Sequence, residues 1–192
     1  MLYEIWNEPN YSAFWNTSGG PNPAAYTDML KRAYVAAKVA DPDATIIGGS
    51  LNHNDQTFLS GMSAAGAHGY FDAFSLHPYT DGTPITDTSS SLISFRPQIE
   101  GLRSALVAHG DSVPIWLTEF GYTTSGTYAV TETARTSYYT TMVSYVRSYP
   151  YVAGLAVFTL NTLNSSGYGL IDHVTGVAAP SWTSYANALK GG

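Results

Sequence analysis

The chain has 192 residues, a formal net charge of −6 and no cysteine; 44 % of its residues are hydrophobic and only 11 % are charged. This composition suffices for one packed domain and excludes a disordered chain, which needs low hydrophobicity and high net charge. The acidic balance argues against a nucleic-acid partner, which requires a basic face. The lack of cysteine excludes disulfides and thiolate metal sites. No apolar run approaches the roughly 20 residues of a membrane span, so we expect no membrane partner.

Short apolar runs alternate with helical segments along the whole chain. The predicted strands are 2–7, 44–48, 71–77, 113–119 and 152–160. The predicted helices are 23–40, 56–65, 91–109, 131–148 and 180–190. Asn22 and Thr131 are placed to cap two of these helices, and Pro23 stands at a first helical position.

This alternation of strands and helices predicts a parallel sheet with helices outside it. The strands are apolar on both faces, as buried parallel strands are. The polar stretches 81–91, 123–128 and 161–169 follow strands and are expected to be long loops on one edge of the sheet. In parallel α/β folds that edge, formed by the carboxyl ends of the strands, carries the ligand.

Two glutamates stand where an expected strand passes into its loop, Glu8 in the run WNEP and Glu119 in the run LTEFG. Side-chain alternation places Glu8 on the face of Trp6 and Glu119 on the face of Leu117. Two glutamates on different parallel strands can then face each other across a barrel mouth. Glycoside hydrolysis needs such a pair, one carboxyl group protonated to assist the leaving oxygen and the other ionised to attack carbon or to activate water.

The segments around these glutamates resemble motifs of clan A glycoside hydrolases, the retaining (β/α)8 enzymes, in the cellulase-like group near families 5 and 39. YEIWNEPN at 3–10 is similar to the strand-four motif of the clan, and WLTEFG at 116–121 is similar to the strand-seven motif. FDAFSLHPY at 71–79 resembles strand six, and AVFTLN at 156–161 resembles strand eight. The order of the four motifs also fits.

The resemblance implies a role for individual residues. Glu8 would be the acid/base and Glu119 the nucleophile. Asn7 would hydrogen-bond the sugar 2-hydroxyl, and His77 and Tyr79 would contact the nucleophile and the sugar. Further candidates for substrate binding are Trp6, Asn52 and Asn161.

Each of the binding assignments has a structural alternative. Asn7 could cap a turn before Pro9, His77 could be a hydrogen-bonded core residue, and Trp6 could fill the barrel. Three aromatic residues after the first strand could stack on a pyranose ring or cover a helix; they are Tyr11, Phe14 and Trp15.

We expect no metal and no cofactor. Gly48 and Gly49 are expected to form a tight turn, because no glycine-rich fingerprint opens a helix there to cradle a phosphate. The histidines outside the motifs show no metal-ligand spacing; they are His53, His68, His109 and His173.

The resemblance also predicts an incomplete scaffold, an α/β fold that is part of a TIM (β/α)8 barrel, with one domain over 1–192. The five predicted strands match strands four to eight of the clan, and strands one to three have no counterpart, whereas a full barrel takes about 250 residues. Two open sheet edges favour a homo-oligomer or a complementing chain. Glu4 would lie inside the barrel without its usual partner.

The functional prediction is a retaining glycosidase acting on a β-linked glycan or glycoside, with a carbohydrate as its partner. The alternative is an inactive barrel remnant that binds carbohydrate or a partner chain. The first residues lack the basic and apolar regions of a signal peptide and begin inside an expected strand. We therefore expect a piece of a longer protein, whose localisation stays open, with secretion of the parent protein as one alternative.

Overall fold

The computed structural model describes residues 1–162 and 167–191, so residues 163–166 of the predicted 161–169 loop lie outside the described part. The strands are β1 (Leu2–Glu4), β2 (Thr45–Asn52), β3 (Ala73–His77), β4 (Ile115–Phe120) and β5 (Val152–Val157). The helices are α1 (Pro23–Ala40), α2 (Gln56–Ala64), α3 (Phe95–Ala108), α4 (Glu132–Ser148) and α5 (Pro180–Lys190).

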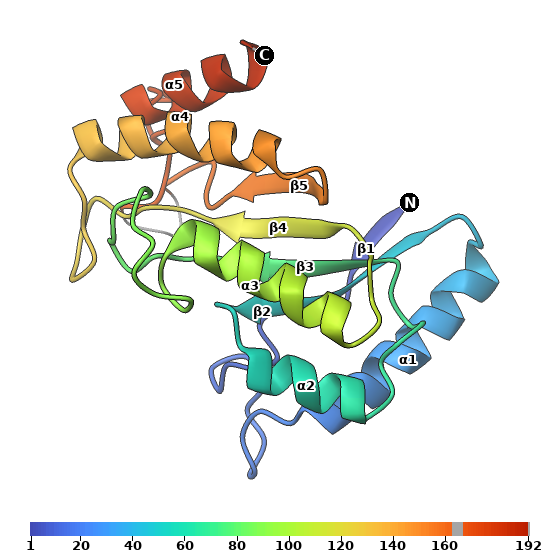
Figure 1. The fold of residues 1–192 in the computed structure, drawn as a ribbon. Coiled ribbons are helices and arrows are strands. Elements are labelled where there is room, and N and C mark those ends of the chain that lie inside the picture. Colours follow the sequence, from blue (N-terminus) through green and yellow to red (C-terminus); the bar gives the residue numbers. More distant parts are fainter. Residues whose placement is uncertain (163–166, 192) are drawn as a thin grey trace.

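All five strands are parallel and form one sheet in the order β1-β2-β3-β4-β5. The sheet curls into half of a barrel (Figure 1). Figure 1 shows α1 and α2 at one end of the sheet, α3 in front of its middle, and α4 and α5 at the other end. The predicted α/β partial barrel is therefore confirmed. No helix among the described residues combines the length and apolar character needed to cross a membrane.

The helix boundaries follow local capping signals. The side chain of Asn22 accepts a hydrogen bond from Ala25 N at 3.0 Å, and Thr131 Oγ1 accepts one from Ala134 N at 3.1 Å. Both predicted caps are thus confirmed. The third helix begins at Phe95 rather than at residue 91. With this later start, Pro97 lies in the first turn of the helix. Backbone N–H groups in the first turn have no intrahelical acceptor, so the missing N–H of proline costs no hydrogen bond there.

Several strand ends differ from the prediction: the third and fourth strands begin two residues later, at Ala73 and Ile115, and the fifth ends at Val157 instead of residue 160. Two further differences are backbone effects. The first strand stops at Glu4 instead of residue 7 because Trp6 adopts a φ of 72°, which is incompatible with extended backbone. The second strand continues to Asn52 instead of ending at residue 48. A register shift between Gly48 and Leu51, with Gly49 at φ 94°, lets it pass a bulge and remain paired with β3.

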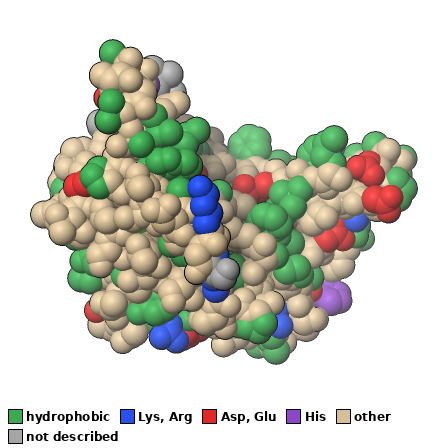
Figure 2. Space-filling view, turned by 90° about the horizontal axis from the view of Figure 1, so that it is seen from above, with side chains coloured by type: hydrophobic (Ala, Val, Ile, Leu, Met, Phe, Trp, Pro, Cys, Tyr) green, Lys and Arg blue, Asp and Glu red, His purple; other side chains and the backbone are tan. Residues whose placement is uncertain are grey.

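The core lies between the sheet and its helices, and the exposed strand residues lie mainly on the edge strands β1 and β5. Strand β3 is entirely buried, whereas every residue of β1 is exposed. Among the described residues β1 and β5 each pair with one neighbour only, so both sheet edges are free. Seen from above, the surface is hollowed between two raised ends, and hydrophobic side chains gather along the hollow (Figure 2).

Asp72 ties α1, β2 and β3 together just before β3. Its Oδ2 accepts the Ile46 N–H at 2.8 Å and lies 2.8 Å from Lys38 Nζ, and its Oδ1 accepts from the Tyr34 hydroxyl. Burial opposes ionisation of this carboxyl, but the hydrogen bonds from Lys38 and Ile46 outweigh it, so the pKa of Asp72 lies below its usual value.

This lowered pKa predicts a pH-dependent stability. Because the folded pKa is below the unfolded value of about 3.9, the ionised side chain stabilises the protein above that pH, and the contribution is lost as the pH falls through the folded pKa. Asp72→Asn should lower the free energy of unfolding by about 1–2 kcal/mol at neutral pH, with a smaller difference near pH 3. Urea denaturation at both pH values measures this.

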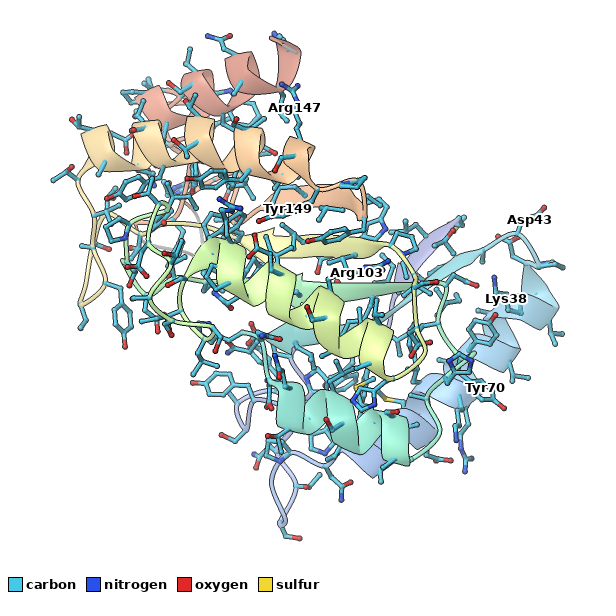
Figure 3. The ribbon with its side chains drawn as sticks, in the orientation of Figure 1. Lys38, Asp43, Tyr70, Arg103, Arg147 and Tyr149 are labelled. Atoms are coloured by element: carbon cyan, nitrogen blue, oxygen red, sulfur yellow. The ribbon has the colours of Figure 1, made fainter. Side chains whose placement is uncertain are left out.

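Asp43 offers a matched control because it is an exposed aspartate in the turn after α1 (Figure 3). Asp43→Asn should change the free energy of unfolding by less than about 0.5 kcal/mol at either pH. An Asp72→Asn effect of equal size at both pH values would contradict the ion-pair explanation.

Candidate active site

Glu8 lies just beyond β1, where the chain turns through positive φ values at Trp6 (72°) and at Glu8 itself (42°). Its N–H donates to Ser50 O at 2.9 Å, so the turn is held against the bulge of β2. Glu8 is only 5 % exposed. Positive φ is uncommon outside glycine and concentrates at functional sites, and here it buries a carboxylate at the end of the sheet.

Glu119 reaches the same end of the sheet from β4 through a second irregularity. The pairing of β4 with β5 shifts register between Leu117 and Phe120, and these two side chains both belong to the core. Glu119 therefore does not share the face of Leu117, and the alternation expected from the sequence is wrong at this point. It is also wrong for Glu8 and Trp6, because Trp6 is 53 % exposed and the strand has already ended.

His77, the last residue of β3, joins the two glutamates. Its Nδ1 lies 2.9 Å from Glu8 Oε1 and 3.9 Å from Glu119 Oε2. The imidazole is 1 % exposed, so its hydrogen bond to the buried Glu8 is shielded from water. Glu8 and His77 thus form a hydrogen-bonded pair, and Glu119 lies at ion-pair distance from the same nitrogen. We name these three residues, at the carboxyl ends of β1, β3 and β4, the Glu–His–Glu cluster.

The other ring nitrogen of His77 leads to Glu4. His77 Nε2 lies 3.2 Å from Thr118 Oγ1, and the Thr118 hydroxyl donates to Glu4 Oε1 at 2.6 Å. Ser50 Oγ lies 3.3 Å from the same nitrogen. Thr118 therefore connects one ring nitrogen of His77 to Glu4, while the other ring nitrogen contacts Glu8.

Tyr79 holds the second glutamate in place. Its hydroxyl donates to Glu119 Oε1 at 2.5 Å, and its ring packs edge-on against Tyr168. Burial, followed by the charge of Glu119, raises the pKa of Tyr79 well above its usual range. The phenol therefore stays protonated and donates to the Glu119 side chain.

Asn52 places an amide beside the first glutamate. Its Nδ2 donates to Glu8 Oε2 at 3.3 Å. The Asn10 side chain fixes the Asn52 backbone, because Asn10 Oδ1 accepts the Asn52 N–H and Asn10 Nδ2 donates to Asn52 O, each at 2.9 Å. The bulge in β2 thus carries Asn52 far enough along the strand to reach Glu8.

The Glu–His–Glu cluster is compact. One oxygen or nitrogen atom from each of its three residues lies within 4.8 Å of the corresponding atoms of the other two. This spacing would admit a cation, but the contact between His77 Nδ1 and Glu8 Oε1 already has the length of a hydrogen bond. Among the described residues that contact is the one hydrogen bond within the cluster, and the expectation of no metal stays a prediction.

Three predicted binding residues lie outside the Glu–His–Glu cluster. Trp6 packs edge-on against Trp15 and donates from its indole N–H to Phe14 O. Asn7 borders a small hollow of about 310 Å³ with Trp6 and Phe14, and among the described residues it makes no hydrogen bond to either glutamate. Asn161 lies beyond β5 in an isolated parallel bridge with Ile171.

Sequence reasoning missed several residues that hold the cluster. Thr118 directly precedes Glu119, yet a threonine in a strand carries no signal of its own. Ser50 depends on the bulge, which brings its Oγ to 3.3 Å from His77 Nε2. Glu4 was expected to lack a partner, and Thr118 supplies one. Asn10 lay within the quoted motif but was not assigned a role.

Solved structures share this fold. A monomeric β-xylosidase from Caulobacter crescentus CB15 is 22 % identical, with 95 % of this chain and 40 % of that chain covered and a TM-score of 0.66. A GH128 subgroup II endo-β-1,3-glucanase from Sorangium cellulosum is 18 % identical, covered over 95 % and 67 %, with a TM-score of 0.69. A GH128 subgroup VII oligosaccharide-binding protein from Trichoderma gamsii is 14 % identical, covered over 99 % and 68 %, with a TM-score of 0.68.

The chain thus spans less than half of the xylosidase and about two thirds of the two GH128 proteins. At these identities the likeness establishes the fold alone. No curated protein matches the sequence significantly. The family model described as "Glycosyl hydrolase catalytic core" matches residues 5–176. Because that match covers most of the chain, the protein belongs to the glycosyl hydrolase catalytic core family.

Proposed function

We propose that this chain carries the catalytic residues of a retaining glycosidase acting on a β-linked glycan. The observation that supports the proposal is the Glu–His–Glu cluster, in which oxygens of Glu8 and Glu119 lie within 4.8 Å of each other. Retaining enzymes place their two carboxyl groups about 5–5.5 Å apart, whereas inverting enzymes need about 6.5–9.5 Å to admit a water molecule. The observed spacing favours retention. The β linkage follows the likeness to a β-xylosidase and an endo-β-1,3-glucanase.

The environments of the two glutamates support different roles. Tyr79 donates to Glu119, which suits a carboxylate that must stay ionised to attack carbon. Glu8 shares a proton with His77, which suits a group that gives up and regains a proton. Glu119 is therefore the nucleophile and Glu8 the acid/base.

The reaction would proceed in two displacements. A Glu119 oxygen bonds to the anomeric carbon while the glycosidic C–O bond breaks, and Glu8 transfers its proton to the leaving oxygen. Ionised Glu8 then takes a proton from water, whose oxygen attacks the same carbon and releases Glu119. His77 orients Glu8 throughout, because its Nδ1 lies 2.9 Å from Glu8 Oε1.

A non-hydrolysing carbohydrate-binding protein is the second candidate. The likeness to an oligosaccharide-binding protein and the free edges of the half-barrel favour it. A homo-oligomer or a complementing chain would pair with those free edges.

Covalent trapping distinguishes the two functions. An activated 2-deoxy-2-fluoroglycoside of glucose or xylose should form a stable ester on Glu119, detected by intact mass and located by peptide mapping. Glu119→Gln should remain unlabelled, whereas Glu8→Gln should still be labelled, because an activated leaving group needs little acid assistance. Binding of β-linked oligosaccharides without any labelling of Glu119 would favour the binding protein.

The acid role of Glu8 predicts a dependence on the leaving group. Glu8→Gln should lower kcat about 10²–10⁴-fold on a glycoside with a poor leaving group and much less on one with an activated leaving group. Steady-state kinetics on a series of aryl glycosides measures the slope against leaving-group acidity. Unchanged turnover of the poorest leaving group would refute the assignment.

The hydroxyl of Tyr79 predicts a change in rate. Tyr79→Phe should lower kcat/KM about 10–100-fold, because it removes the hydrogen bond that positions the Glu119 carboxyl group. Steady-state kinetics on one aryl glycoside measures this. Tyr185→Phe, on α5 away from the cluster, provides the control and should leave kcat/KM unchanged. An unchanged kcat/KM in Tyr79→Phe would contradict this role.

A further inference from the structure

A chain of side-chain contacts runs from Glu4 on β1 to Glu8 through residues of β4 and β3. The Thr118 hydroxyl donates to Glu4 Oε1 at 2.6 Å, and Thr118 Oγ1 lies 3.2 Å from His77 Nε2. The opposite ring nitrogen, His77 Nδ1, lies 2.9 Å from Glu8 Oε1. β1 and β4 are separated by two other strands, so these contacts depend on the curl of the sheet (Figure 1). The proposed reaction uses neither Glu4 nor Thr118.

The contact with Glu4 fixes the direction of the Thr118 hydroxyl. A carboxylate oxygen only accepts hydrogen bonds, and a hydroxyl has a single proton to donate. The distance of 2.6 Å is typical of a charge-assisted O–H···O⁻ bond, which is about twice as strong as a neutral one. The hydroxyl proton therefore stays on the Glu4 side, and Thr118 Oγ1 turns its lone pairs toward His77 Nε2.

Ser50 places a second hydroxyl beside the same nitrogen. Its Oγ lies 3.3 Å from His77 Nε2 and can rotate to donate or to accept, whereas Thr118 can only accept. A proton on Nε2 is compatible with both hydroxyl groups, but a bare Nε2 would face the lone pairs of Thr118 at 3.2 Å. Because the imidazole is 1 % exposed, bulk water would not relieve that mismatch. The two hydroxyl groups together favour a proton on Nε2.

We propose that Glu4 and Thr118 are positioning residues that hold a proton on Nε2 of His77, so that Nδ1 can accept a hydrogen bond from protonated Glu8. A neutral imidazole with its proton on Nε2 has a lone pair on Nδ1. That lone pair matches the acid form of Glu8, which the first displacement requires. In serine proteases a buried aspartate holds the catalytic histidine in one tautomer, and here a hydroxyl group transmits the effect of the carboxylate. The catalytic part of this inference rests on the proposed function, because it takes Glu8 as the acid.

Nuclear magnetic resonance of isotope-labelled histidine locates the proton without requiring turnover. A ring nitrogen that bears a proton has a chemical shift distinct from that of a bare nitrogen, and His77→Gln identifies the signals of His77 by their loss. In the parent protein Nε2 should bear the proton. The proton should move to Nδ1 in Thr118→Val, because Ser50 can then donate to Nε2. It should also move in Glu4→Met, because the freed Thr118 hydroxyl can then donate to Nε2; Glu4 is exposed, so this change spares the core.

Ser50→Ala and Thr136→Val are the controls. Ser50→Ala removes the other hydroxyl beside Nε2 but leaves Thr118 and Glu4, so the proton should stay on Nε2. Thr136 is a half-buried threonine whose hydroxyl donates within α4 at 2.8 Å, and its change to valine should leave the spectrum of the ring unaltered. A melting curve for each variant verifies folding.

Two results would overturn the inference. One is a bare Nε2 in the parent protein. The other is an Nε2 that keeps its proton in Thr118→Val or in Glu4→Met. The second result is expected if the contacts only brace β1 against β4, because a brace affects the melting temperature and leaves the ring proton in place.

Kinetics then tests the consequence for catalysis. With its proton on Nδ1, His77 would match the ionised rather than the acid form of Glu8. Thr118→Val should therefore lower kcat about tenfold on an aryl glycoside with a poor leaving group and less than about twofold on an activated one, with KM unchanged. Thr118→Ser keeps the hydroxyl and should restore both the rate and the proton on Nε2. An equal loss on the two substrates would overturn the positioning role.

The two measurements separate this inference from the proposed function. Labelling of Glu119 by the fluoroglycoside, with a ring proton that responds to neither Thr118→Val nor Glu4→Met, would refute the inference and leave the function intact. A proton that moves in both variants, without any labelling of Glu119, would confirm that Glu4 and Thr118 hold the proton. That result would refute the function and, with it, the acid step.

Discussion

The contact between His77 and Glu8 links two strands that are not neighbours. β1 and β3 are separated by β2, and the contact forms because the chain turns back after β1 while β2 bulges beneath it. Glu119 then joins from β4 through a further register shift. The local irregularities of three strands thus converge on one imidazole, and the geometry of the site depends on that buried ring.

A buried histidine between carboxylates is stable only if its protons are matched by acceptors. Ser50 and Thr118 place hydroxyl groups beside Nε2, and Thr118 in turn donates to Glu4, so a carboxylate on β1 completes the network. Glu4, which would be costly as an isolated charge inside a closed barrel, is here exposed and hydrogen-bonded. The exposed position of Glu4 on β1 is therefore compatible with its place in the hydrogen-bond network of His77.

Asn52 connects the Glu–His–Glu cluster to a neighbouring cavity of about 710 Å³. Its Nδ2 donates to Glu8 Oε2, and the same residue lines the cavity. Asn10 fixes the backbone of Asn52 through two hydrogen bonds. The bulge of β2 therefore sets both one neighbour of Glu8 and one wall of the cavity.

Much of this arrangement was readable from the sequence. Alternating apolar runs and helical segments predicted the order of the elements, and Asn22 and Thr131 predicted two helix starts, because periodicity and capping are local properties. The motifs around Glu8, His77, Tyr79 and Glu119 predicted that these residues belong together, because the carboxyl ends of parallel strands share one edge of the sheet.

Only the tertiary structure determined how the side chains of these four residues contact one another. Side-chain alternation was wrong at Glu8 and Glu119, since positive φ values and register shifts are set by contacts between strands rather than by the residues themselves. For the same reason the roles of Ser50 and Thr118 carried no sequence signal. The sequence alone thus determined which chemical groups reach the edge of the sheet, and packing between the strands determined which atoms touch.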